Sequence, residues 1–138
     1  MTVERPLPQP DRDTQPFWDA CRKHELRAQR CSACGRFRWP PQGLCPHCHA
    51  WNDDWQVLAD TGKVLSFVVA HYVAVQAFAA DVPYVIAHIT IDDTEDEVVL
   101  VSNVVGCDWQ QVHVGMPVRV FFDDVTPDCT LPKFRPVR

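Results

Sequence analysis

Hydrophobic and polar residues alternate over most of the C-terminal half of the chain, a pattern typical of β-strands that bury one face. The longest alternating run is Val64–Val75, in which Leu65, Phe67 and Val69 share one face. Four shorter runs complete a set of five predicted strands: Tyr84–Ile91, Val98–Val105, a run introduced by 114–117 that ends at Phe122, and Thr130–Val137. We therefore expect the C-terminal half to be mainly β.

Two features of these runs predict how the strands are arranged. Asp108–Gln111 indicates a short helical turn between the third and fourth strands, and five short antiparallel strands with such a turn fit a barrel of the OB-fold type. The last strand contains Pro132 and Pro136, which have no backbone N–H to donate, so we expect it to lie at an edge. The loop 77–83, between the first two strands, is rich in small residues.

The N-terminal segment predicts a different structure. Residues 1–13 contain three prolines among polar neighbours and should form an extended lead-in. Thr14 resembles a helix N-cap, and Phe17, Trp18 and Cys21 recur at helical spacing on a short helix. Because a helix this short is marginal alone, its apolar face either packs on the rest of the chain or docks a partner subunit.

Between the helix and the strands, residues 26–58 contain two CxxC pairs, Cys31 with Cys34 and Cys45 with Cys48. Each pair places two sulfur atoms on one tight turn, and two such turns can present four thiolates to one ion. This is the ligand set of a closed tetrahedral Zn²⁺ site, which leaves no position for a substrate. We therefore expect structural zinc, whose binding would supply most of the free energy that folds this segment.

Other uses of these cysteines are less compatible with the sequence. Residues 45–49 match CxxCH, the attachment motif of c-type haem, but this use leaves the first pair without a role. A redox CxxC requires a βαβ context that the chain lacks, and seven cysteines are an odd number for a disulfide framework. His47 or His49 could replace one thiolate, although four sulfur atoms already complete the shell.

Charge is distributed unevenly along the chain. Residues 1–50 carry eight Arg or Lys and five Asp or Glu, a net of +3, whereas residues 51–138 carry five and thirteen, a net of −8. Since phosphate backbones require a basic surface, the acidic strand region argues against nucleic-acid binding. The chain is 46% apolar, shows no signal-peptide pattern and has no run as long as a membrane span, so we expect a globular cytoplasmic protein.

The order of these motifs resembles a known family. The motifs are Phe17-Trp18, the two CxxC pairs with Pro40-Pro41 between them, 62–67 (GKVLSF), 82–84 (VPY), 103–107 (NVVGC), 115–118 (GMPV) and 131–136 (LPKFRP). In combination, over residues 14–137, they resemble the zinc-ribbon OB-fold proteins of the DUF35 family. The resemblance implies a lead-in and short helix at 1–25, a rubredoxin-like four-cysteine zinc ribbon at 26–58 and a five-stranded OB-fold barrel at 59–138.

Proteins of this family are typically accessory subunits of thiolase-fold enzymes that act on CoA thioesters. The resemblance implies a hetero-oligomer in which a thiolase, acyltransferase or aldolase partner supplies the catalytic residues and this chain supplies none. The complex would make or cleave a carbon–carbon bond in an acyl-CoA by thiolytic or retro-aldol chemistry, as in the degradation of steroid side chains or aromatic acids. The barrel would stabilise the partner and help to form the acyl-CoA site, with Phe17 and Trp18 at the docking surface.

Candidate ligand contacts follow from the chemistry of CoA, whose phosphates favour Lys or Arg and whose pantetheine arm favours an apolar slot. They are Lys63, Phe78, Arg119, Lys133, Phe134 and Arg135. Phe78 is singled out because OB barrels use the loop between their first two strands for ligands. Cys107, His71 and His88 are candidates for chemistry of the chain's own, but each is more simply explained by packing. The alternatives to a subunit are a stand-alone acyl-CoA-binding or nucleic-acid-binding module.

Overall fold

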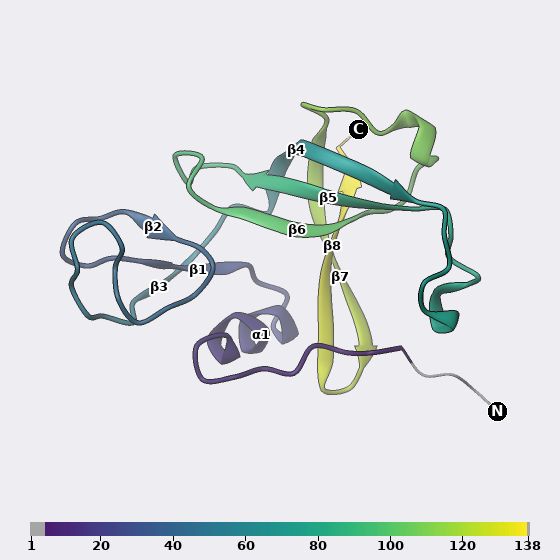
Figure 1. Cartoon of the computed structure of the whole chain (residues 1–138). Helices are drawn as coiled ribbons and strands as arrows, with labels where there is room; N and C mark the ends of the chain where they lie inside the picture. The colour runs from purple at the N-terminus through teal and green to yellow at the C-terminus, as the bar shows by residue number, and fades with distance from the viewer. Residues whose placement is uncertain (1–4, 138) are drawn as a thin grey trace.

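The computed structural model describes residues 5–137 of the chain, so the first four residues of the expected lead-in lie outside the described part. Within it the chain forms one α-helix, a three-stranded sheet and a closed five-stranded barrel (Figure 1). The elements are α1 (Gln15–Arg22), β1 (Arg27–Arg30), β2 (Phe37–Arg38), β3 (Trp55–Val57), β4 (Thr61–Ala70), η1 (Gln76–Phe78), β5 (Tyr84–Ile91), β6 (Val99–Val104), η2 (Trp109–Gln111), β7 (Pro117–Thr126) and β8 (Cys129–Pro136). The predicted fold class, mainly β with a short helix, a four-cysteine ribbon and an OB-type barrel, is confirmed.

The helix α1 packs on the protein itself. Phe17 and Cys21 are buried, and the ring of Phe17 meets the rings of Trp18 and Trp39 edge-on at centroid distances of 5.0 and 4.8 Å. The helix lies beside the β7–β8 hairpin (Figure 1), where the ring of His24 stacks on Phe122. No helix in residues 5–137 is long and apolar enough to cross a membrane.

The barrel has the strand order β4-β5-β6-β8-β7, with β4 and β7 paired to close it. Its centre is filled by fully buried apolar side chains, among them Val64, Ile89, Val118 and Phe134. Gly62 on β4 is paired with β5 on one side and with β7 on the other. A Cβ at this residue would lie 2.5 Å from the carbonyl oxygen of Thr90 on β5. The strands can therefore approach this closely only because residue 62 has no side chain.

The last strand differs from its prediction, because β8 is not an edge strand. It pairs with β7 over its whole length and with β6 in parallel at Val104 and Phe134, so it completes the barrel. Its prolines are compatible with this position because the pairing with β6 is limited to one bridge. A second contact joins β6 to β8 beside this bridge: the hydroxyl of Ser102 on β6 donates to the carbonyl oxygen of Pro132 on β8 at 2.6 Å.

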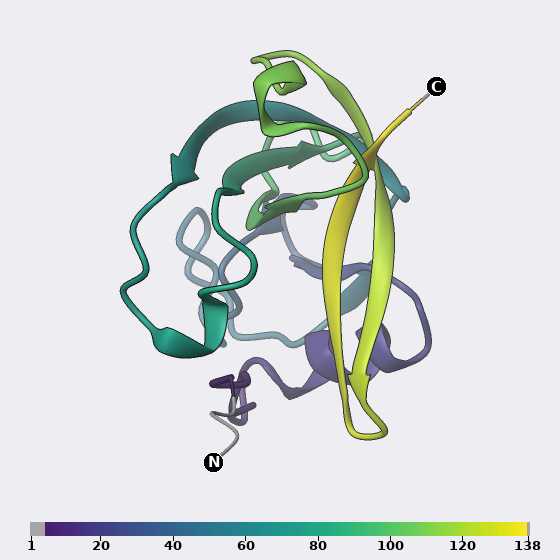
Figure 2. The ribbon, with the colours of Figure 1, turned by 90° about the vertical axis from the view of Figure 1, so that its right-hand side faces the viewer.

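Two strand boundaries also differ from those predicted. The strand β4 ends at Ala70 rather than Val75, because Ala70 pairs with Tyr84, the first residue of β5, and the chain then leaves the sheet for η1. The strand β7 continues beyond Phe122 to Thr126, since the β7–β8 hairpin extends past the barrel to contact α1. Figure 2 shows this hairpin and the η1 segment on either side of the barrel, with the N-terminal lead below them.

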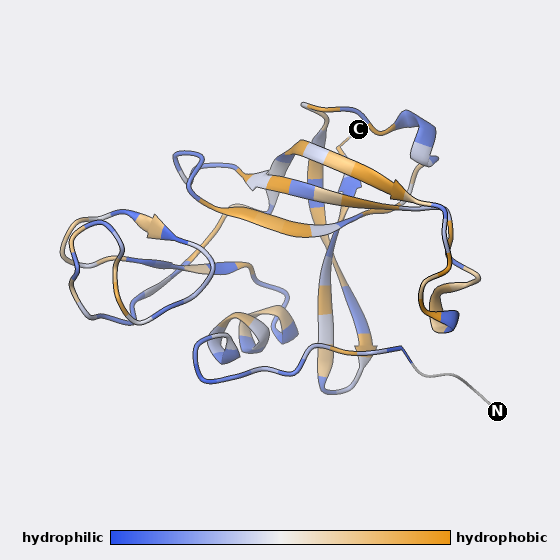
Figure 3. Ribbon diagram, viewed as in Figure 1, coloured by the Kyte–Doolittle hydropathy of each residue, from blue (hydrophilic) through white to orange (hydrophobic). Residues whose placement is uncertain are grey.

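Hydrophobic and hydrophilic residues are distributed according to this arrangement of strands and turns. Figure 3 shows hydrophobic residues concentrated along β4 and β6, and hydrophilic residues at the turn between β5 and β6. That acidic turn, 92–97, joins the barrel to the ribbon through an ion pair of 2.9 Å between Arg36 and Glu97. The barrel and the ribbon are thus in contact through ionic as well as apolar groups.

Candidate functional site

Two tight turns of the ribbon bring the four cysteines together. In the first turn the N–H of Gly35 donates to the carbonyl oxygen of Cys31 at 2.8 Å, and in the second the N–H of His49 donates to that of Cys45 at 2.9 Å. Gly35 and His49 both have positive φ, 79° and 67°, so the two turns have the same backbone form. One sulfur atom from each cysteine lies within 4.8 Å of all the others.

This spacing fits a zinc ion. The Sγ atoms of Cys31 and Cys48 are 3.6 Å apart, and those of Cys34 and Cys45 are 3.7 Å apart. In a tetrahedral site with Zn–S bonds of about 2.3 Å, sulfur atoms are about 3.8 Å apart. The cluster contains four cysteines and no histidine within residues 5–137, so the donor set is the one that structural zinc prefers.

Hydrogen bonds favour the thiolate form of two of these ligands. The amide of Asn52 donates to Cys31 Sγ at 3.3 Å and, together with the backbone N–H of Cys34, lowers the pKa of Cys31 to about 6. The backbone N–H groups of Cys48 and its neighbour lower the pKa of Cys45 as well. The pKa values of Cys34 and Cys48 are raised instead, so one sulfur atom of each CxxC pair favours the thiolate and the other would lose its proton when a cation binds.

A buried arginine, which the sequence analysis missed, holds the second cysteine turn in place. Arg38 is 3% exposed, and its Nε donates to Gln29 Oε1 at 3.0 Å and to the carbonyl oxygen of Gln42 at 2.8 Å. Its Nη2 also donates to the carbonyl oxygen of Asn52 at 2.5 Å. Because Gln42 and Asn52 lie on either side of the second turn, Arg38 fixes both ends of that turn.

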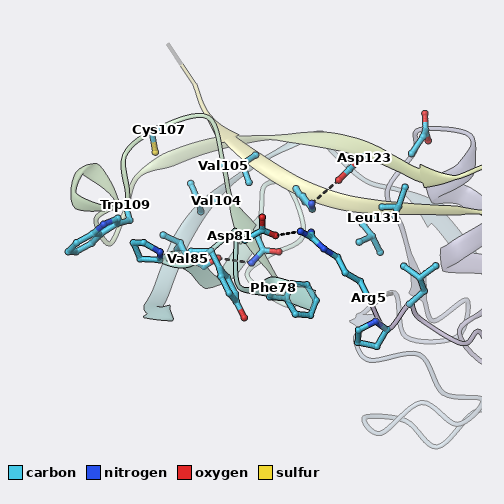
Figure 4. A pocket seen from close by; sticks show the side chains of 18 residues that line it. Arg5, Phe78, Asp81, Val85, Val104, Val105, Cys107, Trp109, Asp123 and Leu131 are labelled. Carbon is cyan, nitrogen blue, oxygen red and sulfur yellow. Dashed lines mark hydrogen bonds and ion pairs between the residues drawn. The ribbon is translucent and has the colours of Figure 1, made fainter. Parts of the chain in front are cut away.

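A cavity of about 680 Å³ opens at one end of the barrel (Figure 4), which is a size typical of small-molecule sites. Five segments surround it: the N-terminal lead, the η1 segment, the adjoining ends of β5 and β6, the segment that runs from β6 to η2, and the β7–β8 hairpin. Most of its wall is apolar, contributed by Leu7, Phe78, Val85, Val104, Trp109, Val125 and Leu131. Two of the predicted ligand contacts, Phe78 and Lys133, line this pocket.

The charged side chains at the pocket are paired with one another, as the dashed lines in Figure 4 show. Arg5 and Asp81 form an ion pair of 2.6 Å, and the guanidinium of Arg5 lies 5.0 Å from the ring centroid of Phe78. Lys133 Nζ lies 2.7 Å from Asp123 Oδ2. Each pocket cation therefore already has a carboxylate partner.

A third pocket carboxylate, Asp124, belongs to the contact between the hairpin and the helix. Its Oδ1 accepts from the hydroxyl of Thr130 at 2.6 Å and lies 3.0 Å from His24 Nε2. These two contacts, Thr130 first, hold the pKa of Asp124 below its usual value. The carboxylate stays ionised at neutral pH and adds negative charge to the rim of the pocket.

The other predicted basic contacts form a row on the outer face of the barrel. Arg119 and Arg135 are paired in the β7–β8 register, Arg119 is also paired with Thr61, and Lys63 follows on the same face of β4. All three basic side chains are exposed, and no ion pair within residues 5–137 involves them. Lys133 lies two residues before Arg135 on β8, so the row leads toward the pocket.

The remaining predicted contacts are placed differently. Phe134 is fully buried in the barrel core, and Phe17 is 6% exposed, so neither ring faces outward. Trp18 lines a second cavity of about 320 Å³, between α1, Trp39 and the strand residues 100–103. Phe17 lines the same cavity but is buried, so Trp18 is the more exposed member of the predicted docking pair.

The residues considered for chemistry of the chain's own lie on different segments of the barrel. Ser66 Oγ is 3.0 Å from His88 Nδ1 on the outer face of the barrel, whereas the ring of His71 meets Trp109 edge-on. Cys107 is at the pocket wall. Burial raises the pKa of Cys21 to about 12, which keeps this thiol protonated and unreactive.

The ribbon and the barrel each match a protein-family model. Residues 18–52 match the family described as "ChsH2, rubredoxin-like zinc ribbon domain". Residues 55–123 match that described as "ChsH2, C-terminal OB-fold domain". The two matched segments follow one another in the order in which the structure places the ribbon and the barrel.

Individual relatives agree with these matches. Over 96% of its length the chain is 38% identical to a "Probable enoyl-CoA hydratase alpha subunit" from Thermomonospora curvata, and it spans about two fifths of the length of that relative. It is 32% identical to a "DUF35 domain-containing scaffold protein" from Methanocaldococcus jannaschii, covering 68% of that protein and 72% of its own length.

A solved structure has the same fold. It is a chain of the "Ltp2-ChsH2(DUF35) aldolase", with a TM-score of 0.83 and 37% sequence identity. The match covers 94% of the present chain and 98% of the solved one. The likeness therefore extends from the helix to the end of the barrel.

Proposed function

The chain belongs to the DUF35 family of zinc-ribbon and OB-fold proteins, and from this membership we propose that it is the non-catalytic subunit of a thiolase-superfamily complex. The complex would make or cleave a carbon–carbon bond in an acyl-CoA, by thiolytic or retro-aldol chemistry. The partner would supply the catalytic residues, and this chain would stabilise the partner and form part of the acyl-CoA site.

One observation carries this proposal. The chain matches almost the whole length of a DUF35 chain from an aldolase complex, rather than an isolated ribbon or barrel. A relative named as a scaffold protein and another named as an enoyl-CoA hydratase subunit support an accessory role in CoA chemistry. The spread of the groups weighed for catalysis, with Ser66–His88 on the outer face and Cys107 at the pocket, also favours catalysis by a partner.

Zinc would be a structural component of this subunit. Cys31, Cys34, Cys45 and Cys48 would hold Zn²⁺, which supplies four coordination bonds to the ribbon and no open position for substrate. The ribbon in turn carries Trp39, which packs on the helix α1. We propose the units 1–25, 26–58 and 59–138 as the docking helix, the metal-bound support and the ligand-binding barrel.

We propose that an extended acyl-CoA lies along the barrel, in a strip that runs from the pocket to the basic row. The apolar pocket lies at one end, next to Phe78 and Lys133, and the exposed row of Arg135, Arg119 and Lys63 lies at the other. Guanidinium and ammonium groups without a carboxylate partner suit phosphates, and the guanidinium of Arg135 is held over the ring of Phe121 at 3.8 Å from its centroid. We propose that this row contacts the CoA phosphates, while the pocket faces the active site of the partner.

The docking surface is proposed to be the groove beside Trp18. Its wall combines Trp18 and Trp39 with Leu100, Val101 and Pro132, and Lys133 is its only charged member within the described residues. A partially exposed tryptophan in an apolar groove is typical of residues that dominate the binding energy of interfaces.

A copurification experiment with two variants tests the proposal. The tagged chain is recovered from a lysate of its native cells at low salt, and the partner is identified by mass spectrometry and assayed with the chain against CoA thioesters. We expect a stoichiometric thiolase-fold protein, and about tenfold weaker assembly for Trp18→Ala. Val114→Ala, an exposed valine outside both cavities, is the matched control.

A chain recovered as a bare monomer would contradict the subunit proposal and favour a stand-alone acyl-CoA-binding module. A thiolase-fold protein could also copurify but turn over acyl-CoA equally well without this chain. That result would support the complex but contradict a shared acyl-CoA site.

A further inference from the structure

We infer that the pocket at the barrel mouth binds the acyl end of the ligand and selects a bulky, uncharged group, while it excludes the CoA nucleotide. This inference rests on the proposed function, because it divides the proposed acyl-CoA strip into an acyl end and a phosphate end. It assigns the pocket a substrate class that the strip alone does not define.

The pocket is large, and most of its wall is apolar. The cavity of about 680 Å³ lies well within the range of pockets that enclose drug-sized ligands, about 300–1,000 Å³. Aromatic and branched side chains such as Phe78, Trp109, Val125 and Leu131 form its wall. A short acetyl group would leave most of this surface without contacts, whereas a polycyclic or long-chain acyl group would cover it.

The charges that line the pocket disfavour a phosphate group. The two cations of the pocket, Arg5 and Lys133, are each ion-paired, to Asp81 at 2.6 Å and to Asp123 at 2.7 Å. With Asp124 the pocket has three carboxylates for two cations, a net charge of −1 with histidine neutral. An entering phosphate would meet net repulsion and would have to break an existing ion pair, so the nucleotide is disfavoured here.

The ion pair of Arg5 also builds part of the pocket wall. Arg5 is bound on one side to Asp81 and on the other to the ring of Phe78, 5.0 Å away. These contacts hold the N-terminal lead against the η1 segment, so that Leu7 becomes part of the apolar surface. The Arg5–Asp81 pair therefore completes the pocket wall rather than serving as a free ligand-binding charge.

The test compares neutral and anionic probes on the full zinc-loaded chain. The chain is 15.8 kDa, which suits ¹H–¹⁵N NMR titration. The probes are 1-octanol and octanoate, which share a chain length, together with testosterone and free CoA. We expect 1-octanol and testosterone to shift the amide signals of Val85, Val104 and Leu131, and octanoate to bind about tenfold more weakly than 1-octanol.

Two variants separate size from charge. Val125→Trp fills the pocket from the hairpin and should weaken 1-octanol binding about tenfold or more, whereas Val114→Trp outside the pocket should not. Asp123→Asn removes one pocket carboxylate and releases Lys133, so it should strengthen octanoate binding about tenfold relative to 1-octanol binding. Asp128→Asn at the exposed hairpin turn is its control.

Octanoate or CoA binding in the pocket as tightly as 1-octanol would overturn the inference, as would neutral probes that leave the pocket signals unmoved. These titrations need no partner, so their failure is separate from failure of the proposed function. In the partner complex, Val125→Trp could leave the turnover of both bulky acyl-CoA and acetyl-CoA unchanged. That result would support the proposed function but contradict the selectivity of the pocket.

Discussion

At the scale of single residues, Cys34 offers the sharpest test of the metal site. Its Sγ lies 3.7 Å from that of Cys45, and the residue is exposed, so serine removes one ligand without opening a cavity in the core. We expect Cys34→Ser to bind much less than one zinc per chain and to lose the order of the ribbon. The barrel, which supplies most of the buried residues of the shared core, should stay folded. Metal analysis and the dispersion of amide signals measure the two effects.

The matched control is Cys129→Ser, because Cys129 is a half-buried cysteine outside the cluster. It should retain one zinc and an ordered ribbon. A Cys34→Ser chain that is metal-free yet keeps the ribbon amide signals of the native chain would show that the fold of the ribbon does not depend on zinc.

The metal ligands could be predicted from the sequence because their signal is local. Two CxxC pairs define two turns whatever the rest of the chain does. Arg38 and Asn52 gave no such signal, since their roles depend on burial and on partners many residues away, such as Gln29. Apart from Phe78, which was also chosen for its loop, the ligand candidates were chosen by residue type, and only the strand register reveals that Arg119 and Arg135 face each other.

At the scale of elements, closure of the barrel depends on Gly62. A Cβ at this position would lie 2.5 Å from the carbonyl oxygen of Thr90 and 2.9 Å from Ile89 Cγ2, so β4 and β5 would have to move apart. We expect Gly62→Ala to lower the free energy of unfolding by about 2 kcal/mol. Urea unfolding measures this change. Val68→Ala, an exposed position on the same strand, should change it by less than about 0.5 kcal/mol.

An unchanged unfolding midpoint for Gly62→Ala would mean that the strands at this crossing can separate without cost.

Alternating patterns predicted the strands but not which strands are neighbours in the barrel. Pro132 and Pro136 suggested an edge because the sequence does not reveal that β8 meets β6 at a single bridge. The extension of β7 to Thr126 depends on contacts with α1, which only the assembled fold provides.

At the scale of the whole molecule, the acidic barrel has a basic row at the site proposed for the CoA phosphates. The net charge of −8 for residues 51–138 hides the fact that Lys63, Arg119 and Arg135 are exposed together without carboxylate partners in the described part of the chain. Many of the acidic residues lie elsewhere, at the turn 92–97 and in the ion pairs of the pocket. The distribution of charge, rather than its sum, therefore decides which ligands the barrel can accept.

This distribution leads to a prediction for the assembled enzyme. Replacing both Arg119 and Arg135 with Gln should raise the KM for acyl-CoA about tenfold or more and leave kcat within about twofold, because the phosphates are bound equally before and during the reaction. The effect should shrink at high ionic strength, where exposed charges are screened. Arg36→Gln, which alters an ion pair beside the ribbon, is the control and should leave KM unchanged. If the double variant assembled much more weakly with the partner but the complex that did form kept the native KM, the basic row would belong to the docking surface instead of the CoA site.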